Sequence, residues 1–440
     1  MNTAVSYLPS AFQPANASEA EIKRVFEKQR DTALRLRTST CEERLAKIQR
    51  LKEALLAHRQ DVIDAGYKDF KKPPAEVELT EILPTLQDAA DARKHLKKWM
   101  KPKGVWPTIM MGGTKGWVQY EPKGRCLIIS PWNYPVTLTF GPLVSCIAAG
   151  NTAMIKPSEM TPHLSALMVR IVREIFTEDE VAIFEGDAAV STALLSLPFD
   201  HTFFTGSPAI GKVVMAAAAK HLTSVTLELG GKSPTIVDET ADLKMAAQTI
   251  AWGKYTNNGQ TCIAPDHIYV HAAVKDEFIR IFKETLKTSF GEGAAVMNSP
   301  FLARVVNERH TKRIGALLSD AVQRGAKVAV GGEVDEKACF IAPTLITDIP
   351  RDAKIMEEEI IPFQVSKGMV ICGSFRGETD DSAYIWIRRF NSEAEREAQY
   401  KAVYETDYWK TKIAPRVPDC LDREKMHIQR IVPTSRSTMQ

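Results

Sequence analysis

The chain has 440 residues, of which 44% are apolar and 25% are charged. These values are typical of a globular protein with two or three domains. The net charge of +3 is small for this length, so nucleic acid is not an expected partner. The N-terminus lacks a basic start followed by an apolar stretch, which excludes a secretory signal and predicts a cytoplasmic protein.

The apolar and cysteine-containing segments predict neither a membrane span nor a metal site. Residues 126–155 carry no charge, but three prolines interrupt them, so we expect a buried strand, a turn and a buried helix. The seven cysteines are an odd number without a close pair, which excludes a CxxC zinc or redox site. In a cytoplasm they are expected to be reduced thiols.

The first hundred residues have helical periodicity. Ser18 and Glu21 predict a capping box before one helix, and the next helix carries its apolar residues on one face. Residues 107–122 then predict two strands around Gly112 and Gly113. The apolar face of the second helix comprises Leu45, Ile48, Leu51 and Leu55.

From Arg125 onward, short apolar strands alternate with helices. This alternation predicts a parallel sheet with helices on both faces. A similar alternation from 234 to about 345 predicts a second α/β domain. In the first of these regions the predicted strands are "CLIIS", "TAMIK", "HTFFT" and "VTLEL", and the predicted helices cover about 137–149, 161–176 and 208–220.

The turn after "HTFFT" has two interpretations. Residues 206–212 fit the spacing of a nucleotide P loop, but Val213 follows where a magnesium-binding hydroxyl is needed, so ATP is disfavoured. Gly206 and Ser207, at a helix start, can still offer N–H groups to a pyrophosphate. A tight glycine turn without any ligand is the simpler alternative.

Three further turns contain polar groups that ligands use. Glu228 ends a strand before two glycines and is either a structurally paired acid or a tuned base. Asn133, between two prolines, is either a turn residue or a donor to a developing oxyanion. Lys156 and Glu159 form either a local ion pair or a site for sugar hydroxyls.

Cys262 differs from other cysteines in its sequence context. Cys126 and Cys146 lie in apolar runs and are expected to be inert packing residues. Cys262 instead follows the polar bend 257–259 and precedes a helix or loop start, where nearby N–H groups can stabilise a thiolate. We therefore interpret Cys262 as a candidate nucleophile.

Six motifs together resemble the aldehyde dehydrogenase superfamily. They occur in the family's order and spacing over roughly residues 15–360, and "AWGKYTNNGQTCIAPD" is most similar to the branch of class 3 and coniferyl aldehyde dehydrogenases. The resemblance implies an oxidoreductase with a Rossmann-like NAD-binding domain and a second α/β catalytic domain. The motifs are "SPWNYP" (130–135), "IKPSE" (155–159), "FTGS" (204–207), "ELGGKSP" (228–234), "GQTC" (259–262) and "MEEEI" (356–360).

The resemblance also implies a mechanism and a cofactor. Cys262 would attack an aldehyde carbonyl, with Asn133 and the Cys262 N–H holding the oxyanion. Glu228 would activate water to release the carboxylic acid. NAD is the expected cofactor, with NADP possible, because a carboxylate at position 159 suits a free 2′-hydroxyl. The implied cofactor-binding residues are Trp132, Lys156, Glu159, Gly206, Ser207 and Glu359.

The resemblance to this family stops near Ile360. Residues 361–440 instead resemble the second half of a NIPSNAP-type domain, a ferredoxin-like module, through "GSFRGE", "WIRRF" and "AVYETDYWK". We expect a βαβ segment there, with "SAYIWIRRF" as the first strand, a helix capped by Ser392 and Glu395, and "HIQRIVPT" as the last strand. The abrupt change predicts a fusion of two truncated domains, by nature, by a deletion or by a sequence error.

The predicted domains follow from these resemblances. The hairpin is similar to the family's oligomerisation arm, so a homodimer is expected if it still pairs. The domains are residues 1–104 and 123–230 for NAD binding, 105–122 for the hairpin, 231–360 for a truncated catalytic domain, and 361–440 for the C-terminal segment.

Three functions compete on this basis. The first is NAD(P)-dependent oxidation of an aromatic or medium-chain aldehyde to its acid. The second, an acylating thioester-forming dehydrogenase, is disfavoured because Glu228 supplies a hydrolytic base. The third is a catalytically impaired dinucleotide-binding or interaction protein. A truncated core exposes apolar surface, and the free-energy cost of that exposure far exceeds the roughly 5–15 kcal/mol net stability of a domain.

Overall fold

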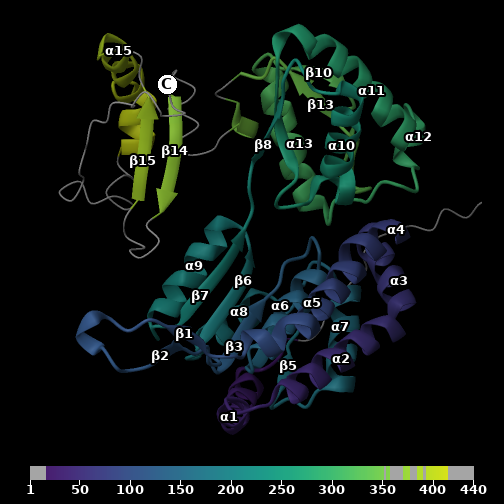
Figure 1. Ribbon diagram of the computed structural model, residues 1–440. Helices are drawn as coiled ribbons and strands as arrows, with labels where there is room; N and C mark the ends of the chain where they lie inside the picture. The colour runs from purple at the N-terminus through teal and green to yellow at the C-terminus, as the bar shows by residue number, and fades with distance from the viewer. Residues whose placement is uncertain (1–15, 351–352, 357–369, 377–383, 390–392, 415–440) are drawn as a thin grey trace, which may run out of the picture. The chain divides into compact units, whose positions relative to one another are not determined.

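A computed structural model describes residues 16–350, 353–356, 370–376, 384–389 and 393–414 (Figure 1). The chain divides into two compact units. The first unit contains residues 1–315 and 328–345, and the second contains 316–327 and 346–440. The predicted boundary between a cofactor domain and a catalytic domain, at 230 and 231, falls inside the first unit.

Helices form the start of the described chain, as its periodicity predicts. They are α1 (Glu19–Leu36), α2 (Cys41–Ala57), α3 (Arg59–Phe70), α4 (Pro74–Val77), the π-helical turn η1 (Glu78–Ile82) and α5 (Leu83–Trp99). Ser18 caps α1 by accepting a hydrogen bond from the Glu21 N–H, and Thr40 with Glu43 forms a reciprocal capping box at α2. The predicted apolar face of α2 is confirmed, since Leu45 packs partly buried against the core and Ile48, Leu51 and Leu55 are buried.

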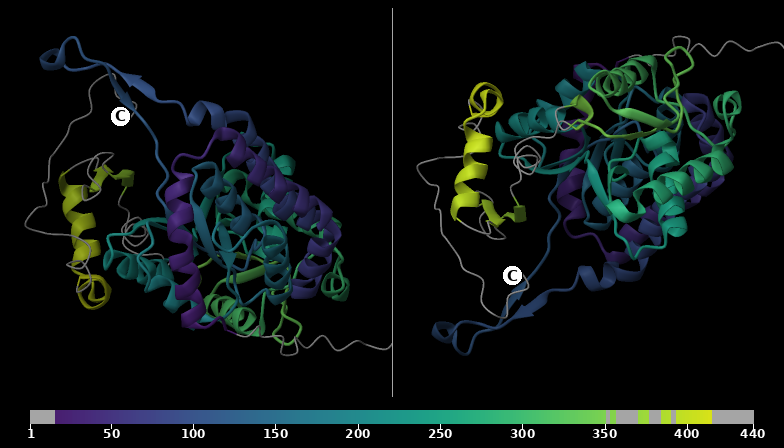
Figure 2. Two further views of the ribbon diagram at one scale, coloured as in Figure 1. Left: turned by 90° about the horizontal axis from the view of Figure 1, so that it is seen from below. Right: turned by 90° about the horizontal axis from the view of Figure 1, so that it is seen from above.

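A hairpin follows these helices and differs in detail from the prediction. Its antiparallel strands are β1 (Lys103–Val105) and β2 (Gly116–Val118), with a 3-10 turn, η2 (Ile109–Met111), between them. The first strand therefore lies before the expected range of 107–122. Both views of Figure 2 show the hairpin projecting from the rest of the first unit, which leaves Trp106, Ile109 and Met110 almost fully exposed.

A parallel sheet of five strands, in the order β5-β4-β3-β6-β7, forms the centre of the first unit. The four strands that the sequence predicts are confirmed, and the three predicted helices follow them as expected. The sequence analysis missed β5 and α8, because each is short. The elements are β3 (Arg125–Ile129), α6 (Thr137–Ala148), β4 (Thr152–Lys156), α7 (Pro162–Ile175), β5 (Val181–Ile183), α8 (Ala188–Leu195), β6 (His201–Gly206), α9 (Pro208–Ala219) and β7 (Ser224–Leu229).

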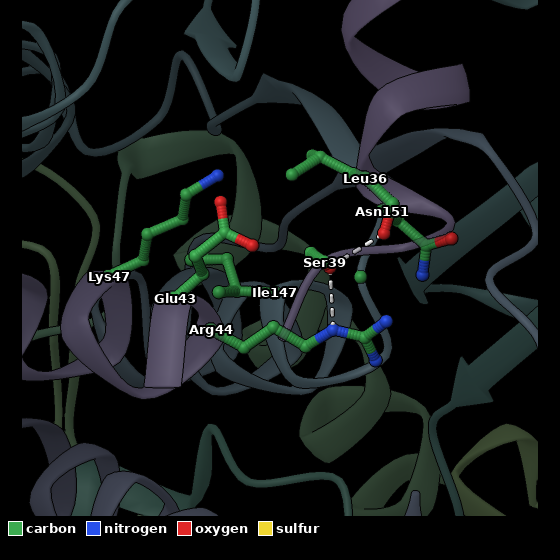
Figure 3. Close-up of a pocket in the computed structure, with 8 residues that line it drawn as sticks. Leu36, Ser39, Glu43, Arg44, Lys47, Ile147 and Asn151 are labelled. Atoms are coloured by element: carbon green, nitrogen blue, oxygen red, sulfur yellow. Dashed lines mark hydrogen bonds between the residues drawn. The ribbon is translucent and has the colours of Figure 1, made fainter. Parts of the chain in front are cut away.

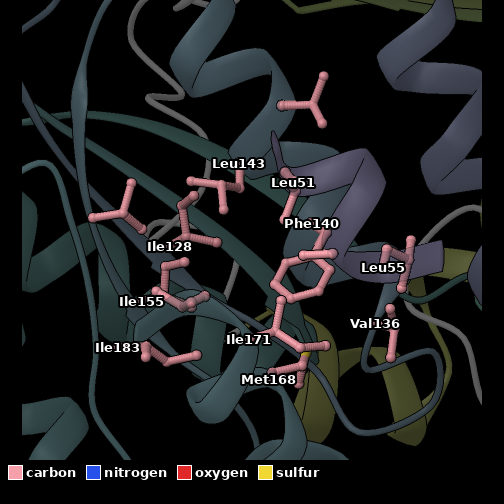
Figure 4. Packing of buried hydrophobic residues seen from close by; sticks show 14 of the residues in the cluster. Leu51, Leu55, Ile128, Val136, Phe140, Leu143, Ile155, Met168, Ile171 and Ile183 are labelled. Carbon is pink, nitrogen blue, oxygen red and sulfur yellow. The ribbon is translucent and has the colours of Figure 1, made fainter. Parts of the chain in front are cut away.

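Alternate residues of each central strand enter two separate cores. In β3, Ile128 packs into a core with helices α2, α5, α6 and α7, which Figure 4 shows around Phe140. The next residue, Ile129, packs into the opposite core with α1, α8 and α9. Because both faces are covered, the β4 strand is buried at all five positions, as expected for a parallel sheet between helical layers.

The second predicted run of α/β alternation is also confirmed within the first unit. Parallel strands β8 and β9 pack one face against α10 and α11 through Val237, Ile250 and Phe282. The elements after β7 are β8 (Ser233–Val237), α10 (Leu243–Tyr255), the 3-10 turn η3 (Thr256–Gly259), β9 (Pro265–Val270), η4 (Ala272–Val274), α11 (Lys275–Phe290), α12 (Ala294–Met297), α13 (Glu308–Gln323), β10 (Lys327–Val330), β11 (Val334–Asp335), β12 (Phe340–Ile341), β13 (Leu345–Thr347) and η5 (Lys354–Met356).

The C-terminal elements correct one prediction. "SAYIWIRRF" is a strand, β15 (Tyr384–Arg389), but β14 (Val370–Arg376) precedes it and pairs with it antiparallel, so β15 is not the first strand. The predicted helix ends early, as α15 (Glu393–Tyr404), and a π-helical turn, η6 (Trp409–Ile413), follows it. Ser392 and the predicted strand "HIQRIVPT" lie outside the described residues, and the NIPSNAP resemblance stays a prediction.

Candidate active site

Most of the predicted site residues lie along one edge of the five-stranded sheet. The strands are parallel, so their carboxyl ends share an edge, with neighbouring strands about 4.8 Å apart. Lys156 ends β4, Asn133 follows β3, Ser207 follows β6 and Glu228 lies near the end of β7. Since these strands are ordered β4-β3-β6-β7, these residues follow one another along the edge in that order.

The Lys156–Glu159 pair forms as one of the two sequence interpretations expects. The Lys156 ammonium lies 2.6 Å from the Glu159 carboxylate, and Lys156 is only 3% exposed while Glu159 is 41% exposed. This is not an ordinary surface ion pair, because a buried lysine loses hydration and needs its partner. The arrangement holds an exposed carboxylate at the end of β4.

Gly206 and Ser207 form the start of α9. The Ser207 hydroxyl accepts a hydrogen bond from the Ile210 N–H and so caps the helix. A side chain at Gly206 would force the buried Phe204 ring to move, because an added Cβ would lie 2.5 Å from that ring. Packing alone therefore explains the glycine, and the same turn still points the N-terminal end of the helix dipole at the sheet edge.

Glu228 lies in β7 opposite Thr205 of β6, and its side chain is exposed. None of the described residues forms a hydrogen bond or ion pair with its carboxylate, so this part of the chain does not support a structurally paired acid. The strand then leads to Gly231, where an added Cβ would lie 3.2 Å from the Cys262 carbonyl oxygen. The segment that carries Glu228 thus passes directly beside Cys262.

The bend before Cys262 has an unusual backbone. Asn257, Asn258 and Gly259 have φ angles of 54°, 50° and 77°, in the left-handed region where glycine and asparagine are tolerated best. Cys262 follows in a turn that leads into β9, so the loop alternative holds and no helix begins there. The Cys262 side chain is half-buried, whereas Cys126 and Cys146 are buried as packing residues.

The bend is bonded to the segment that carries Asn133. The Asn133 side-chain N–H donates to the Gln260 carbonyl at 2.9 Å, and the Asn257 side-chain N–H donates to the Asn133 carbonyl at 2.7 Å. The next residues also meet, through a hydrogen bond between the hydroxyls of Tyr134 and Thr261. Residues about 125 positions apart in the sequence are thereby fixed side by side, next to Cys262.

Gln260 connects this bend to a further loop. Its side-chain N–H donates to the carbonyls of Asn257 (3.0 Å) and Arg304 (2.9 Å), and its oxygen accepts from the Val306 N–H (2.9 Å). The glutamine is buried, and every polar atom of its amide is used. The sequence analysis quoted Gln260 only as part of "GQTC", since local pattern does not indicate these partners.

His310 is a residue near the site that the sequence analysis missed. Its ring lies 5.2 Å from that of Trp132, the residue before Asn133. Both ring nitrogens are buried without a hydrogen-bond partner among the described residues. Burial, followed by the charges of Arg313 and Arg309, lowers the pKa of His310, so the neutral ring is favoured. Glu359, the remaining predicted cofactor residue, lies outside the described residues.

A small cavity elsewhere in the first unit has a structural explanation. It is lined by Ser39, Glu43 and Arg44 among others (Figure 3). The Arg44 guanidinium donates to the Ser39 hydroxyl at 2.9 Å and to the Ala148 carbonyl, at the end of α6, at 3.0 Å. A cation at a helix C-terminus is favourable, so the arginine anchors α2 to α6. The cavity contains none of the predicted site residues.

Comparison with known proteins decides the family. Residues 10–362 match the model of the aldehyde dehydrogenase family. The chain belongs to the aldehyde dehydrogenase family. It is 43% identical to 4,4′-diaponeurosporen-aldehyde dehydrogenase of Staphylococcus aureus, over 72% of this chain and 68% of the relative. It is 39% identical to aldehyde dehydrogenase family 3 member A2 of Pongo abelii, over 78% of this chain and 68% of the relative.

A solved structure agrees with these relatives. The substrate-bound state of Staphylococcus aureus AldH has 41% sequence identity and a TM-score of 0.72, over 77% of this chain and 73% of the other. The α/β fold class of the region that the family model matches and the class 3 resemblance are thereby confirmed. The chain is an NAD(P)-dependent aldehyde dehydrogenase by family, and the alternative of an impaired binding protein is not favoured.

Two further findings concern the extent of the family match and the helices of this aldehyde dehydrogenase. The family match ends at residue 362, close to the position where the motifs stop. Among the described helices, none combines the length and the apolar character that a membrane crossing requires.

Proposed function

We propose that Cys262, Asn133 and Glu228 carry the aldehyde oxidation of this enzyme. The observation that supports this best is the bonding of the Asn133 segment to the Cys262 bend through Gln260 and Thr261. Such bonding holds an amide donor and a thiol at a fixed separation, which nucleophilic attack with oxyanion stabilisation requires.

Attack on the aldehyde is the first step. The Cys262 thiolate forms a bond to the carbonyl carbon, and the carbonyl electron pair moves to the oxygen. Asn133 uses one side-chain N–H on the Gln260 carbonyl, so its second N–H and the Cys262 backbone N–H are the donors proposed for the oxyanion. The product is a thiohemiacetal on Cys262.

Hydrolysis of the resulting thioester is assigned to Glu228. The hydride of the thiohemiacetal carbon would need an acceptor, which a nicotinamide dinucleotide would supply when bound. Glu228 then takes a proton from water, whose oxygen adds to the thioester carbon while the carbon–sulfur bond breaks and the thiolate returns. The exposed Glu228 carboxylate, on the segment that passes Cys262, is suitably placed to meet water.

The sheet edge fits a dinucleotide. The N-terminus of α9 offers N–H groups and a positive dipole end to a pyrophosphate. The Lys156–Glu159 pair provides a donor and an exposed acceptor for the hydroxyls of a ribose. Because a carboxylate repels a 2′-phosphate, we propose that NAD is preferred over NADP, although the family uses both. Trp132 and Glu359 are the further proposed contacts.

The substrate class and the assembly are proposed on the branch resemblance. Aromatic or medium-chain aldehydes are the expected substrates, as for the class 3 and coniferyl branch. A homodimer formed through the β1–β2 hairpin is the expected assembly, because Trp106, Ile109 and Met110 would otherwise leave a large apolar area in water.

The test is NADH formation by the purified chain with a panel of aromatic and aliphatic aldehydes. Cys262→Ala should lower kcat by at least about 10³-fold, because no other group forms the covalent intermediate. Glu228→Gln should still form about one NADH per enzyme molecule, but it should release the carboxylic acid slowly. Turnover that survives Cys262→Ala would refute the proposed chemistry.

A further inference from the structure

The segment 70–81, which joins α3 to α5 through α4 and η1, contacts both loops of the candidate active site. We call it the 70–81 brace. None of its residues belongs to the proposed catalytic or cofactor-binding set. Its first contact is a backbone hydrogen bond at 2.8 Å, from the Arg304 N–H to the Phe70 carbonyl. The Arg304 carbonyl in turn accepts from Gln260. The brace thus reaches the Cys262 bend through one intermediate residue.

A buried ion pair in the brace holds the Asn133 segment. The Lys72 ammonium lies 2.8 Å from the Glu81 carboxylate, and both side chains are essentially unexposed. The other Glu81 oxygen accepts from the N–H groups of Val136 (3.0 Å) and Thr137 (3.1 Å), at the start of α6. These groups lie three and four residues after Asn133, so Glu81 fixes where that segment leaves the sheet edge.

The same lysine also contacts the segment directly. Its ammonium lies 4.1 Å from the centre of the Tyr134 ring, a cation–π contact in a buried setting. The Tyr134 hydroxyl bonds the Thr261 hydroxyl, next to Cys262. A continuous chain of contacts therefore leads from Glu81 through Lys72 and Tyr134 to the residue before Cys262.

Glu76 of the brace holds the other loop. Its carboxylate accepts a hydrogen bond at 2.9 Å from the N–H of Asn257. Asn257 is fully buried and has a left-handed backbone, a conformation that persists only where surrounding contacts impose it. The pKa of Glu76 is raised, because the effect of burial exceeds the opposing effects of the Asn257 N–H and the Lys72 charge.

Stability alone does not account for this arrangement. A buried ion pair loses hydration on both sides, and apolar residues of similar volume are often equally stable in its place. In the brace, however, the carboxylates of Glu76 and Glu81 accept hydrogen bonds from segments that carry proposed reacting groups, and Lys72 contacts the Tyr134 ring. Because hydrogen bonds depend on orientation, the charged groups fix how these segments are oriented, which apolar packing does not do.

We propose that Glu76, supported by the buried Lys72–Glu81 pair of the same segment, is a positioning residue that sets the Asn133 amide and the Cys262 thiol relative to one another. The inference rests on the proposed function, because it assigns those two groups to the reaction. It predicts that the brace affects acylation of Cys262 and leaves cofactor binding at the sheet edge unchanged.

The experiment compares Glu76→Ala, Glu76→Gln and Glu78→Ala in the full chain. Glu78 is the matched control, since it lies two residues later in the same segment but pairs with Arg59 on the surface. The main readout is acylation by p-nitrophenyl acetate, which needs the thiolate and the oxyanion donors but no hydride transfer. Alkylation of Cys262 by iodoacetamide, the Kd for NAD and the Tm complete the set, with Cys262→Ala as background.

Glu76→Ala should slow acylation roughly ten- to hundredfold, because small misplacements of reacting groups have effects of that size. Glu76→Gln should recover most of the rate, because its amide oxygen still accepts from the Asn257 N–H. Glu78→Ala should match the native rate, and the Kd for NAD should stay within about twofold in all three. Glu76→Asp, which withdraws the acceptor by one methylene, should be intermediate and replaces Glu76→Ala if that variant does not fold.

Two outcomes would overturn the inference. One is native acylation in a folded Glu76→Ala or Glu76→Asp variant. The other is a loss of acylation rate in Glu78→Ala as large as in the Glu76 variants for the same fall in Tm. That result would show that Glu76 has a merely structural role. If Cys262→Ala itself keeps acylation and turnover, the proposed function fails instead, so the two failures are distinguishable.

Discussion

The two parallel sheets of the first unit differ in how they are covered. The five-stranded sheet has a core on each face, and β4 is buried throughout. In the β8–β9 sheet, Val237 packs against α10 and α11, but the paired residues Ile236 and Tyr269 are 78% and 56% exposed. The family match ends at residue 362, beyond these strands. The difference teaches that the edge proposed to bind the cofactor belongs to a sheet covered on both faces, whereas the Cys262 bend leads into a sheet that exposes Ile236 and Tyr269 within the described part of the chain.

The largest expected effect tests this difference in cover directly. Phe140→Ala should lower the free energy of unfolding by about 3–5 kcal/mol, because Phe140 is fully buried and its removal leaves a cavity. Ile236→Ala should change it by less than about 0.5 kcal/mol, since that side chain is already in water. Urea unfolding of both variants gives the two values, and equal losses would show that the β8–β9 face is covered in solution.

A second prediction concerns the other bare apolar surface, the β1–β2 hairpin. If two copies pair through it, Trp106→Ser should weaken the dimer by about 2 kcal/mol or more, because buried tryptophans dominate such interfaces. Sedimentation over a range of concentrations would show dissociation at higher protein concentration than in the native chain. A native chain that is monomeric, or a variant with unchanged dissociation, would contradict the proposed dimer.

A third prediction compares two lysines, one at the end of a strand of the five-stranded sheet and one on a helix that packs against it. Lys156 is buried and paired at the edge, whereas Lys212, the lysine of the apparent P loop, is exposed on α9. Lys156→Ala should raise the Kd for NAD about tenfold, the loss of about one charge-assisted hydrogen bond. Lys212→Ala should leave it within about twofold. Fluorescence titration with NADH checks both, and a larger effect at position 212 would revive the P-loop interpretation.

The smallest effect is electrostatic and lies in the turn between α7 and β5. Hydrogen bonds from Arg24 and then Lys28 lower the pKa of Glu178 to about 2, well below its ordinary value of 4.5. The folded state therefore gains stability from this carboxylate above about pH 4.5 and loses it as the pH falls towards 2. Because the pair is largely exposed, the gain should be under about 1 kcal/mol.

Glu178→Gln checks this small term. The variant should be less stable than the native chain at neutral pH, and the difference should vanish near pH 2. Thermal unfolding from pH 2 to 7 measures it, with 1 M salt expected to shrink the difference through screening. A difference that grows as the pH falls would have the wrong sign and would contradict the assignment.

Much of the fold was predictable because it depends on local pattern. The runs "CLIIS", "TAMIK", "HTFFT" and "VTLEL" are the strands β3, β4, β6 and β7, and their parallel order follows from the helices between them. The strand β5 was missed, because a run of three residues carries little periodicity. The strand β14 was also missed; it has seven residues, and its pairing with β15 is irregular between Ile371 and Gly373. The first strand of the hairpin was predicted too late in the sequence, because Gly112 and Gly113 indicate a turn but not where the paired strands begin.

The site was predictable in part. Cys262, Asn133 and Glu228 were indicated by their positions after strands and at a polar bend, and the structure brings their segments together. Gln260, Glu76 and the Lys72–Glu81 pair carried no such signal. Their partners lie up to 181 residues away in the sequence, as the hydrogen bond between Glu76 and Asn257 shows.

The sequence by itself determined the order of strands and helices, the residues at each strand end and the cysteine that stands apart from the apolar runs. Tertiary structure alone decided which buried charges meet which backbone N–H groups, and hence how Glu76 and Glu81 contact both active-site loops. The physical reason is that helix and strand periods are properties of neighbouring residues. A buried polar group instead takes whatever partner the folded chain brings within about 3 Å, and the local pattern does not contain that choice.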